Sequence, residues 1–316
     1  MLFRSSPFAE KIEDYDGMLA MCGAMQKKMW ELVETTSNYE KENSYKKEKL
    51  LWEEGVFDWQ DAIEKIDYYA MPKSIKESLK EELPESIYNF NSKNYNYFIK
   101  KFPPSIIYRL YPLLSNETVF LDIETTGIKP SNAHITVIGC YDGKEMKVFV
   151  HGINEKEFLD YIKDYSIIVT FNGSCFDIPF LERYFETNIN CAQIDLRFLL
   201  KELGYSGGLK KIEHDVGLSR GDDMEGVNGY TAVLLWNYYK DTKDKTAIDS
   251  LIHYNLLDTI NLEHLLCLAY NKYADMYKTK TLEYRTLPII ESYKPNKKLI
   301  DYLHKNPYKY APKSES

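Results

Sequence analysis

The sequence has no hydrophobic run long enough to cross a bilayer. Its most apolar stretches, such as SIIVTF and HITVIGC, have the length of β-strands, whereas a transmembrane helix needs about 20 apolar residues. The first residues, MLFRSSPFAEKIED, reach acidic side chains too early for a secretory signal. We therefore expect a protein that makes no membrane contact and is located in the cytoplasm.

Cysteine pairs with C-x-x-C spacing are also missing. The five cysteines of the 316-residue chain are scattered, at positions 22, 140, 175, 191 and 267. This pattern favours reduced, buried thiols in a cytoplasmic protein. Internal repeats and low-complexity tracts do not stand out either, so the chain is expected to fold into ordinary globular parts.

Basic residues are outnumbered, and the formal net charge is −8. This balance argues against a general nucleic-acid coat, because phosphate binding favours Lys and Arg. Residues 1–105 hold 15 basic and 19 acidic side chains, residues 106–270 hold 15 and 24, and residues 271–316 hold 10 and 5. The middle is therefore acidic, as a carboxylate metal site would require, although most of these charges must be solvated.

Three parts are expected along the chain. Residues 1–105 look helical and irregular, and the two prolines in KFPPSII at 101–107 mark the end of this region, because proline interrupts helices. Residues 106–276 alternate β-rich and helical patterns. Residues 277–316 form a basic tail rich in Tyr and Lys. The tail is predicted either to bind a nucleic-acid strand or to pack on its own domain.

The middle part is predicted to contain five strands. The first three are ETVFLDI, HITVIGC and EMKVFVH, and two more follow at 166–171 and 190–194. Helices are expected near 154–163, 178–187, 195–203, 208–215, 229–240 and 246–276. A three-stranded meander followed by alternating helices and strands predicts an α/β domain with a mixed sheet covered by helices. Ligands of such sheets bind at strand ends.

Carboxylates occupy the ends of two of these strands. Asp122 and Glu124 stand two residues apart in LDIETTG, so both side chains point to the same face of the sheet. Two like charges this close repel, and a fold keeps such a pair only in water or against a cation. Asp177 follows the fourth strand, in FNGSCFDIPFL, and opens a helix. A helix-capping role is the alternative for that residue.

Asp258 lies in the middle of the long helix expected over 246–276. Its neighbours are the apolar residues Leu256, Leu257, Ile260 and Leu262. A carboxylate in such surroundings requires a partner or a metal ion. The sequence therefore offers four carboxylates in an order and context that suit a common site.

The motifs DIETTG, N-x-x-x-F-D and Y-x-x-x-D, spread over roughly residues 117–270, resemble those of the DEDD exonucleases. These are 3′→5′ exonucleases of the ribonuclease-H-like superfamily. A closer resemblance, to the YprB-like ribonuclease-H-like family, is carried by IDLRFLLKEL, GGLKKIEHDVGLSR, YNLLDTINLEHL and the LW-x-x-G segment in LLWEEGVFDW. The resemblance implies a ribonuclease-H-like mixed five-stranded sheet flanked by helices, with a helical N-terminal region.

The resemblance also implies a function. Asp122, Glu124, Asp177 and Asp258 would be catalytic carboxylates that bind two Mg²⁺ or Mn²⁺ ions, with Asp122 bridging both. Such ions, typically ~3.5–4 Å apart, stabilise the attacking and leaving oxygens of a phosphoryl displacement. The expected enzyme removes nucleotides from DNA or RNA, acting on single strands or 3′ ends. The alternatives are a structure-specific endonuclease and an inactive nucleic-acid-binding adaptor.

The resembling enzymes differ in the group beside the attacking water, and both versions are present in HYNLLD. His253 stands five residues before Asp258, and Tyr254 stands four before it. On a continuous helix the residue four back is displaced by ~40° and the residue five back by ~140°. Because the segment contains no Gly or Pro, we expect an unbroken helix and Tyr254 on the Asp258 face. His253 is the alternative general base.

Further residues carry weaker predictions. Asn172 is predicted to contact substrate or to fix the turn before Asp177. Thr125 and Thr126 would touch a terminal nucleotide through their backbone, or simply form a turn. Lys210 and Lys211 at a helix start would bind phosphate or face solvent. Asp195 is expected to cap the following helix and to stay outside the metal site.

Overall fold

The structure is a computed structural model that describes residues 62–64, 66–68, 73–128, 133–224, 226–277 and 280–311. The LLWEEGVFDW segment, one carrier of the YprB-like resemblance, lies outside the described residues. The chain divides into two compact units. One comprises Met1–Leu114 with Tyr270–Leu282, and the other comprises Ser115–Ala269 with Glu283–Ser316.

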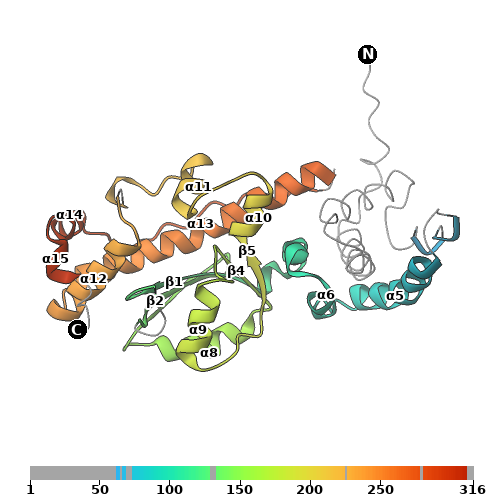
Figure 1. The fold of residues 1–316 in the computed structure, drawn as a ribbon, viewed down its shortest axis with the longest axis horizontal. Coiled ribbons are helices and arrows are strands. Elements are labelled where there is room, and N and C mark those ends of the chain that lie inside the picture. Colours follow the sequence, from blue (N-terminus) through green and yellow to red (C-terminus); the bar gives the residue numbers. More distant parts are fainter. Residues whose placement is uncertain are drawn as a thin grey trace, which may run out of the picture. The chain divides into compact units, whose positions relative to one another are not determined.

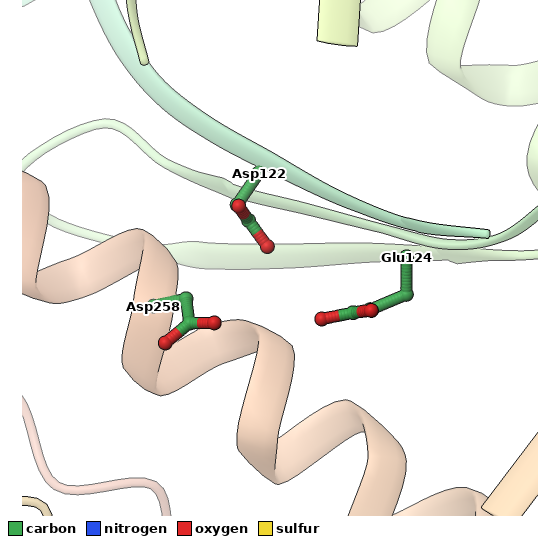
Figure 2. A group of neighbouring side chains, drawn as sticks. All are labelled: Asp122, Glu124 and Asp258. Atoms are coloured by element: carbon green, nitrogen blue, oxygen red, sulfur yellow. The ribbon is translucent and has the colours of Figure 1, made fainter. Parts of the chain in front are cut away.

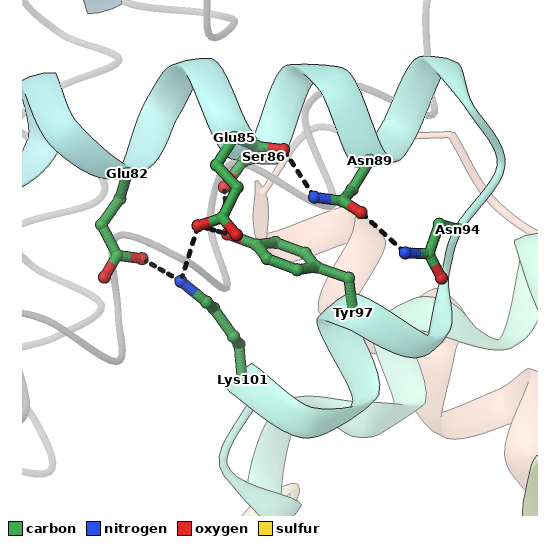
Figure 3. Close-up of polar contacts among 7 residues, drawn as sticks. All are labelled: Glu82, Glu85, Ser86, Asn89, Asn94, Tyr97 and Lys101. Atoms are coloured by element: carbon green, nitrogen blue, oxygen red, sulfur yellow. Dashed lines mark hydrogen bonds and ion pairs between the residues drawn. The ribbon is translucent and has the colours of Figure 1, made fainter.

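The described part of the first unit is helical. It contains α5 (Lys73–Asn91), α6 (Asn96–Lys101), α7 (Tyr111–Leu114) and the 3-10 helices Ile66–Tyr68 and Pro104–Leu110. Polar contacts hold α6 against α5 (Figure 3). Lys101 Nζ lies 2.7 Å from a Glu82 oxygen and 3.6 Å from a Glu85 oxygen, and the Tyr97 hydroxyl donates to Glu85 at 3.1 Å. Helix α6 ends just before the two prolines, as expected.

The second unit is built on a five-stranded mixed sheet with the order β3-β2-β1-β4-β5 (Figure 1). The strands are β1 (Thr118–Thr125), β2 (Ile135–Tyr141), β3 (Met146–Val150), β4 (Ile167–Thr170) and β5 (Ala192–Asp195). The pairs β1–β2 and β2–β3 are antiparallel, whereas β1–β4 and β4–β5 are parallel. The predicted fold class and all five strands are confirmed.

Alternation along β1 separates a core face from a polar face. Val119, Leu121 and Ile123 are buried in a cluster with residues of α8 (Phe158–Tyr161) and α9 (Asp177–Phe185). The residues between them point to the opposite face, where α12 (Gly229–Thr242) and α13 (Lys245–Tyr277) lie (Figure 1). The sheet is therefore covered on both faces, and β1 presents its polar residues to α13.

After β5 the chain forms α10 (Leu196–Glu202), α11 (Leu209–Asp215) and the 3-10 helix Asp222–Met224 before it enters α12. Shorter 3-10 helices precede β1, at Ser115–Glu117, and lie between β3 and β4, at Glu155–Glu157 and Ile162–Asp164. Helix α13 runs without interruption over 33 residues, because no Gly or Pro breaks the pattern. Within the part of the chain that the structure describes, no helix combines the length and hydropathy needed to span a membrane.

The C-terminal tail packs on its own unit. It contains α14 (Lys297–Lys305) and α15 (Pro307–Tyr310), and Leu299, Ile300 and Leu303 of α14 are buried. The His304 ring is hydrogen-bonded to the Thr231 hydroxyl at 2.8 Å, and Asn237 donates to the carbonyl of Tyr310 at 2.8 Å. Of the two predictions for the tail, packing on its own domain is the one that these contacts match.

Candidate metal centre

Three carboxylates meet where β1 faces α13. Asp122 and Glu124 come from the polar face of β1, and Asp258 comes from the middle of α13 (Figure 2). One oxygen of each lies within 4.8 Å of the others. Glu124 and Asp258 are buried and Asp122 is partly buried. Residues from two distant parts of the chain thus form one acidic group.

Asp177 lies beside this group. It is the first residue of α9, and its Oδ1 accepts a hydrogen bond of 3.2 Å from the backbone N–H of Ile123, the residue between Asp122 and Glu124. The residue at the N-cap position is Phe176. Asp177 is buried and is directed toward β1, so its position differs from that of an ordinary capping aspartate.

Burial and mutual repulsion disfavour the ionised form of these four carboxylates. Burial, followed by the charges of the neighbouring carboxylates, raises the pKa of Asp122 and the pKa of Glu124 well above their ordinary values. Burial also raises the pKa of Asp177 to about 7, although the Ile123 N–H opposes that shift. A divalent cation would relieve both effects.

Asn255 holds Asp122 in place from α13. Its side-chain amide donates to the Asp122 carboxylate at 2.8 Å and to the Asp122 carbonyl at 3.1 Å. The strand residue beneath is Gly139, which pairs with Asp122 in the β1–β2 ladder. A Cβ at position 139 would collide with Asn255 Oδ1 and would lie 2.7 Å from Thr259 Oγ1. Glycine is therefore required for the helix to approach the strand this closely.

Arg220 is the cation nearest to Asp258 among the described ion pairs. Its guanidinium contacts the carboxylates of Asp258 and Glu213, and Nε donates to Glu213 at 2.6 Å. The other Glu213 oxygen accepts from Asn261 Nδ2 at 2.9 Å. Burial raises the pKa of Glu213, and the nearby Arg220 charge opposes that shift. Arg220 thus connects Asp258 to a second buried carboxylate.

Tyr254 shares the Asp258 side of α13. It is buried, and the charges of Asp258, Glu124 and Asp122 add to burial in raising the pKa of its hydroxyl. Lys210 Nζ lies 4.5 Å from the centre of the Tyr254 ring and donates to the Val227 carbonyl. Burial lowers the pKa of Lys210. The tyrosine is therefore a neutral hydroxyl close to the carboxylates.

His253 points elsewhere. Its Nδ1 lies 2.8 Å from the carbonyl oxygen of Tyr293, in the segment between α13 and α14. The unbroken helix separates this ring from the Asp258 face, as the angular argument predicts.

Thr125, Thr126 and Asn172, three of the residues with weaker predictions, lie in two turns. The Thr125 hydroxyl donates to the Gly127 carbonyl at 2.8 Å, and the Thr126 hydroxyl accepts from the His134 N–H at 3.1 Å. Asn172 has a left-handed backbone with φ 67°. Its N–H donates to Asp195 at 2.8 Å, and Asp195 also caps α10. Each side chain has a structural contact, so the turn interpretation is sufficient for all of them.

The donor set fits hard divalent cations. Carboxylate oxygens are the ligands that Mg²⁺ and Mn²⁺ prefer, and Asp122, Glu124 and Asp258 each offer one such oxygen within 4.8 Å of the others. Asp122, Glu124 and Asp258 are the residues placed to bind an ion together, with Asp177 next to them.

The sequence interpretation did not identify Asn255, Glu213 and Arg220 as parts of the site. The sequence contained a signal for Glu213 and Arg220, because both lie in the GGLKKIEHDVGLSR motif. There Glu213, inside an expected helix, precedes Arg220 by seven residues. For Asn255 the signal was a polar residue one turn before Asp258 in an apolar helix.

A family model agrees with this fold. Residues 119–270 match the family model of the RNase_H superfamily, and the domain has the ribonuclease-H-like fold. The chain is similar to the family B DNA polymerase from the hyperthermophilic archaeon Pyrobaculum calidifontis, with 16% identity and a TM-score of 0.33, over 56% of this chain and 31% of the polymerase. It is also similar to Brucella melitensis NrnC, in a structure with bound Mg²⁺, with 17% identity and a TM-score of 0.34, over 52% of this chain and 79% of NrnC. No curated protein matches.

Proposed function

We propose that this protein is a metal-dependent nuclease that removes nucleotides from the 3′ ends of DNA or RNA by two-metal-ion chemistry of the tyrosine type. The observation that carries the proposal is the meeting of Asp122, Glu124 and Asp258, with ligand oxygens within 4.8 Å of one another, inside a domain of the ribonuclease-H-like fold. Three carboxylates in a partly buried group are costly to maintain without a cation. A metal-binding role explains that cost.

The chain's own groups have distinct roles in this proposal. Asp122, Glu124, Asp177 and Asp258 hold two Mg²⁺ or Mn²⁺ ions, which supply water activation and neutralisation of phosphate charge when bound. Asn255 fixes the Asp122 carboxylate through its 2.8 Å hydrogen bond. The Tyr254 hydroxyl orients the attacking water, because its raised pKa keeps it neutral.

Substrate contacts are proposed at the end of β1. Thr125 and Thr126 follow the acidic pair, and the loop with Asn172 precedes Asp177, so a terminal nucleotide bound at the ions would lie next to both turns. The preferred substrate is a single strand or a frayed 3′ end, because one terminal phosphodiester must reach a partly buried group of carboxylates.

A digestion panel tests the proposal. Single- and double-stranded DNA and RNA, labelled at either the 5′ or the 3′ end, are incubated with the protein in Mn²⁺, Mg²⁺ or EDTA. We expect a ladder of shortening products from 5′-labelled single strands and release of the label as a mononucleotide from 3′-labelled ones. Both products should be absent in EDTA.

Asp122→Asn, which removes one charge and keeps the side-chain shape, should lower the rate by at least about 10²-fold, as loss of a key electrostatic group does. Asp160→Asn is the matched control, because Asp160 is exposed and its ion pair is with Lys163, at 2.7 Å, far from the acidic group in the sequence. Internal cleavage without end dependence would indicate an endonuclease. Binding without hydrolysis would indicate an adaptor.

A further inference from the structure

Arg220 is held beside the carboxylates by residues that have no part in binding the metals. Its Nε donates to Glu213 at 2.6 Å, and Asn261 donates to the other Glu213 oxygen at 2.9 Å. The Glu213 side chain is only 1% exposed, and the Arg220 side chain is 13% exposed. A buried carboxylate is costly to maintain. We therefore expect that Glu213 holds the Arg220 guanidinium in a fixed position.

The terminal nitrogens of Arg220 lie between two carboxylates. Nη1 contacts Asp258 and Nη2 contacts Glu213 as ion pairs. Both nitrogens are buried. Arginine presents its N–H donors in a planar fork that matches phosphate oxygens. This fork therefore lies next to the proposed metal ligand Asp258.

We propose that Arg220 is a catalytic residue that binds a non-bridging oxygen of the scissile phosphodiester, and that Glu213 and Asn261 are its positioning residues. This inference rests on the proposed nuclease function. Asp258 would release the guanidinium when it holds a cation, while the Glu213 contact would keep the guanidinium beside the site. A donor fixed before the reaction stabilises the charge that develops on phosphate.

Arg285 provides a matched comparison. Its guanidinium lies 3.1 Å from the carboxylate of Glu263, whose side chain is 2% exposed, and it donates to the Gly143 carbonyl at 3.3 Å. This is again an arginine paired with a buried glutamate. Its partner residues are not among the proposed metal ligands, so loss of Arg285 reports the structural cost of such a pair alone.

The first experiment measures single-turnover hydrolysis of a 5′-labelled single-stranded oligonucleotide at saturating Mn²⁺. Arg220→Gln should lower the rate by about 10²–10³-fold, the usual effect of removing one donor to a developing oxyanion. The hydrolysis rate of Arg285→Gln should remain within about twofold of the wild-type rate, because neither Arg285 nor Glu263 is among the residues proposed to bind metal or substrate. Arg220→Lys keeps the positive charge but loses the planar fork of donors, so its hydrolysis rate is expected between these two values. This variant replaces Arg220→Gln in the test if Arg220→Gln does not fold.

Two further measurements separate substrate contact from a structural role. Calorimetric titration with Mn²⁺ alone should give Arg220→Gln an affinity equal to or higher than that of the wild type, because a competing cation at Asp258 has been removed. Substrates with Rp or Sp phosphorothioate at the terminal linkage replace one non-bridging oxygen at a time. The ratio of the Rp rate to the Sp rate should differ from the wild-type ratio in Arg220→Lys and should equal it in Arg285→Gln.

Each other outcome overturns the inference. A folded Arg220→Gln protein with the wild-type rate removes the assigned role and leaves the proposed nuclease intact. A lower rate with weaker Mn²⁺ binding, or with an unchanged Rp/Sp ratio in Arg220→Lys, assigns the arginine to maintenance of the metal site. Absence of hydrolysis by the wild type overturns the proposed function, and the inference with it.

Discussion

The side-chain amide of Asn255 donates to both the carboxylate and the backbone carbonyl of Asp122, at 2.8 Å and 3.1 Å. These two residues are 133 positions apart in the chain. The contact fixes the distance between α13 and β1, and therefore the distance between Asp258 on the helix and the acidic pair on the strand. Close approach at this point depends on Gly139, which lies under Asn255 in the neighbouring strand.

Gly139→Ala should therefore destabilise the domain by about 1–3 kcal/mol, the usual cost of overpacking a core. The new methyl group would collide with Asn255 and Thr259, so the helix must move away from the strand. Urea denaturation followed by circular dichroism measures the change. Gly229→Ala is the control, because a Cβ at that position meets no atom within 4 Å. Equal stability of the two variants would show that α13 adjusts without strain.

Charge removal within the carboxylate group should have opposite effects at two positions. Asp122→Asn relieves repulsion and keeps an acceptor for Asn255, so its melting temperature in EDTA should rise above that of the wild type. Asp258→Asn leaves the Arg220 guanidinium without one of its two carboxylates, so its melting temperature should fall. Removing one partner of a buried pair typically costs about 3–5 kcal/mol.

Addition of Mn²⁺ extends this test. Ligands that bind only the native state stabilise it, so the wild-type melting temperature should rise with Mn²⁺ concentration. The melting temperatures of Asp122→Asn and Asp258→Asn should rise less with Mn²⁺ than that of the wild type. A full Mn²⁺ response in both variants would contradict the assignment of these two carboxylates as metal ligands.

The sheet and the shared face of Asp122 and Glu124 were predictable because they depend on local periodicity, whereas the grouping of these residues with Asp258 was implied by the family resemblance. Alternation in VFLDIET fixes Asp122 and Glu124 on one face, and the absence of Gly and Pro fixes Tyr254 and Asp258 on one helix. The partners of these residues were not predictable in the same way. Asn261 and Glu213 are 48 residues apart, and only packing of α11 against α13 brings them together.

The tail shows a different limit. Its positive charge and tyrosines favour a strand-binding extension, whereas Leu299, Ile300 and Leu303 follow the spacing of an amphipathic helix and are buried. The composition describes the whole tail at once, whereas the packing of the helix depends on the spacing of these three apolar residues. The periodicity of this short segment was the better guide to its structure.

Leu303→Ala should accordingly cost about 2–5 kcal/mol of stability, as large-to-small substitutions in cores do. Leu303 is fully buried. Tyr308→Ala should change the stability by less than about 0.5 kcal/mol, because Tyr308 is 94% exposed. Chemical denaturation of both variants checks the ranking. If Leu303→Ala were as stable as the wild type, α14 would not be part of the folded unit in solution.

Tyr254→Phe tests the group that is proposed to orient the attacking water. The substitution removes one hydroxyl and keeps the ring that packs under Lys210, so stability and substrate affinity should change little. Turnover should fall by roughly 10–100-fold, the usual effect of losing an orienting group next to a metal site. Some activity should remain, because the carboxylates that bind the ions are unchanged.

His253→Ala is the matched comparison from the adjacent position of the same helix. Its ring contacts the Tyr293 carbonyl and faces away from the carboxylates, so turnover in this variant should stay within a few-fold of the wild type while stability decreases slightly. Steady-state hydrolysis of the same oligonucleotide by both variants at equal Mn²⁺ gives the ranking. If His253→Ala lost more turnover than Tyr254→Phe, the helix would have to open before Asp258 in the active enzyme, and the histidine would be the group beside the water.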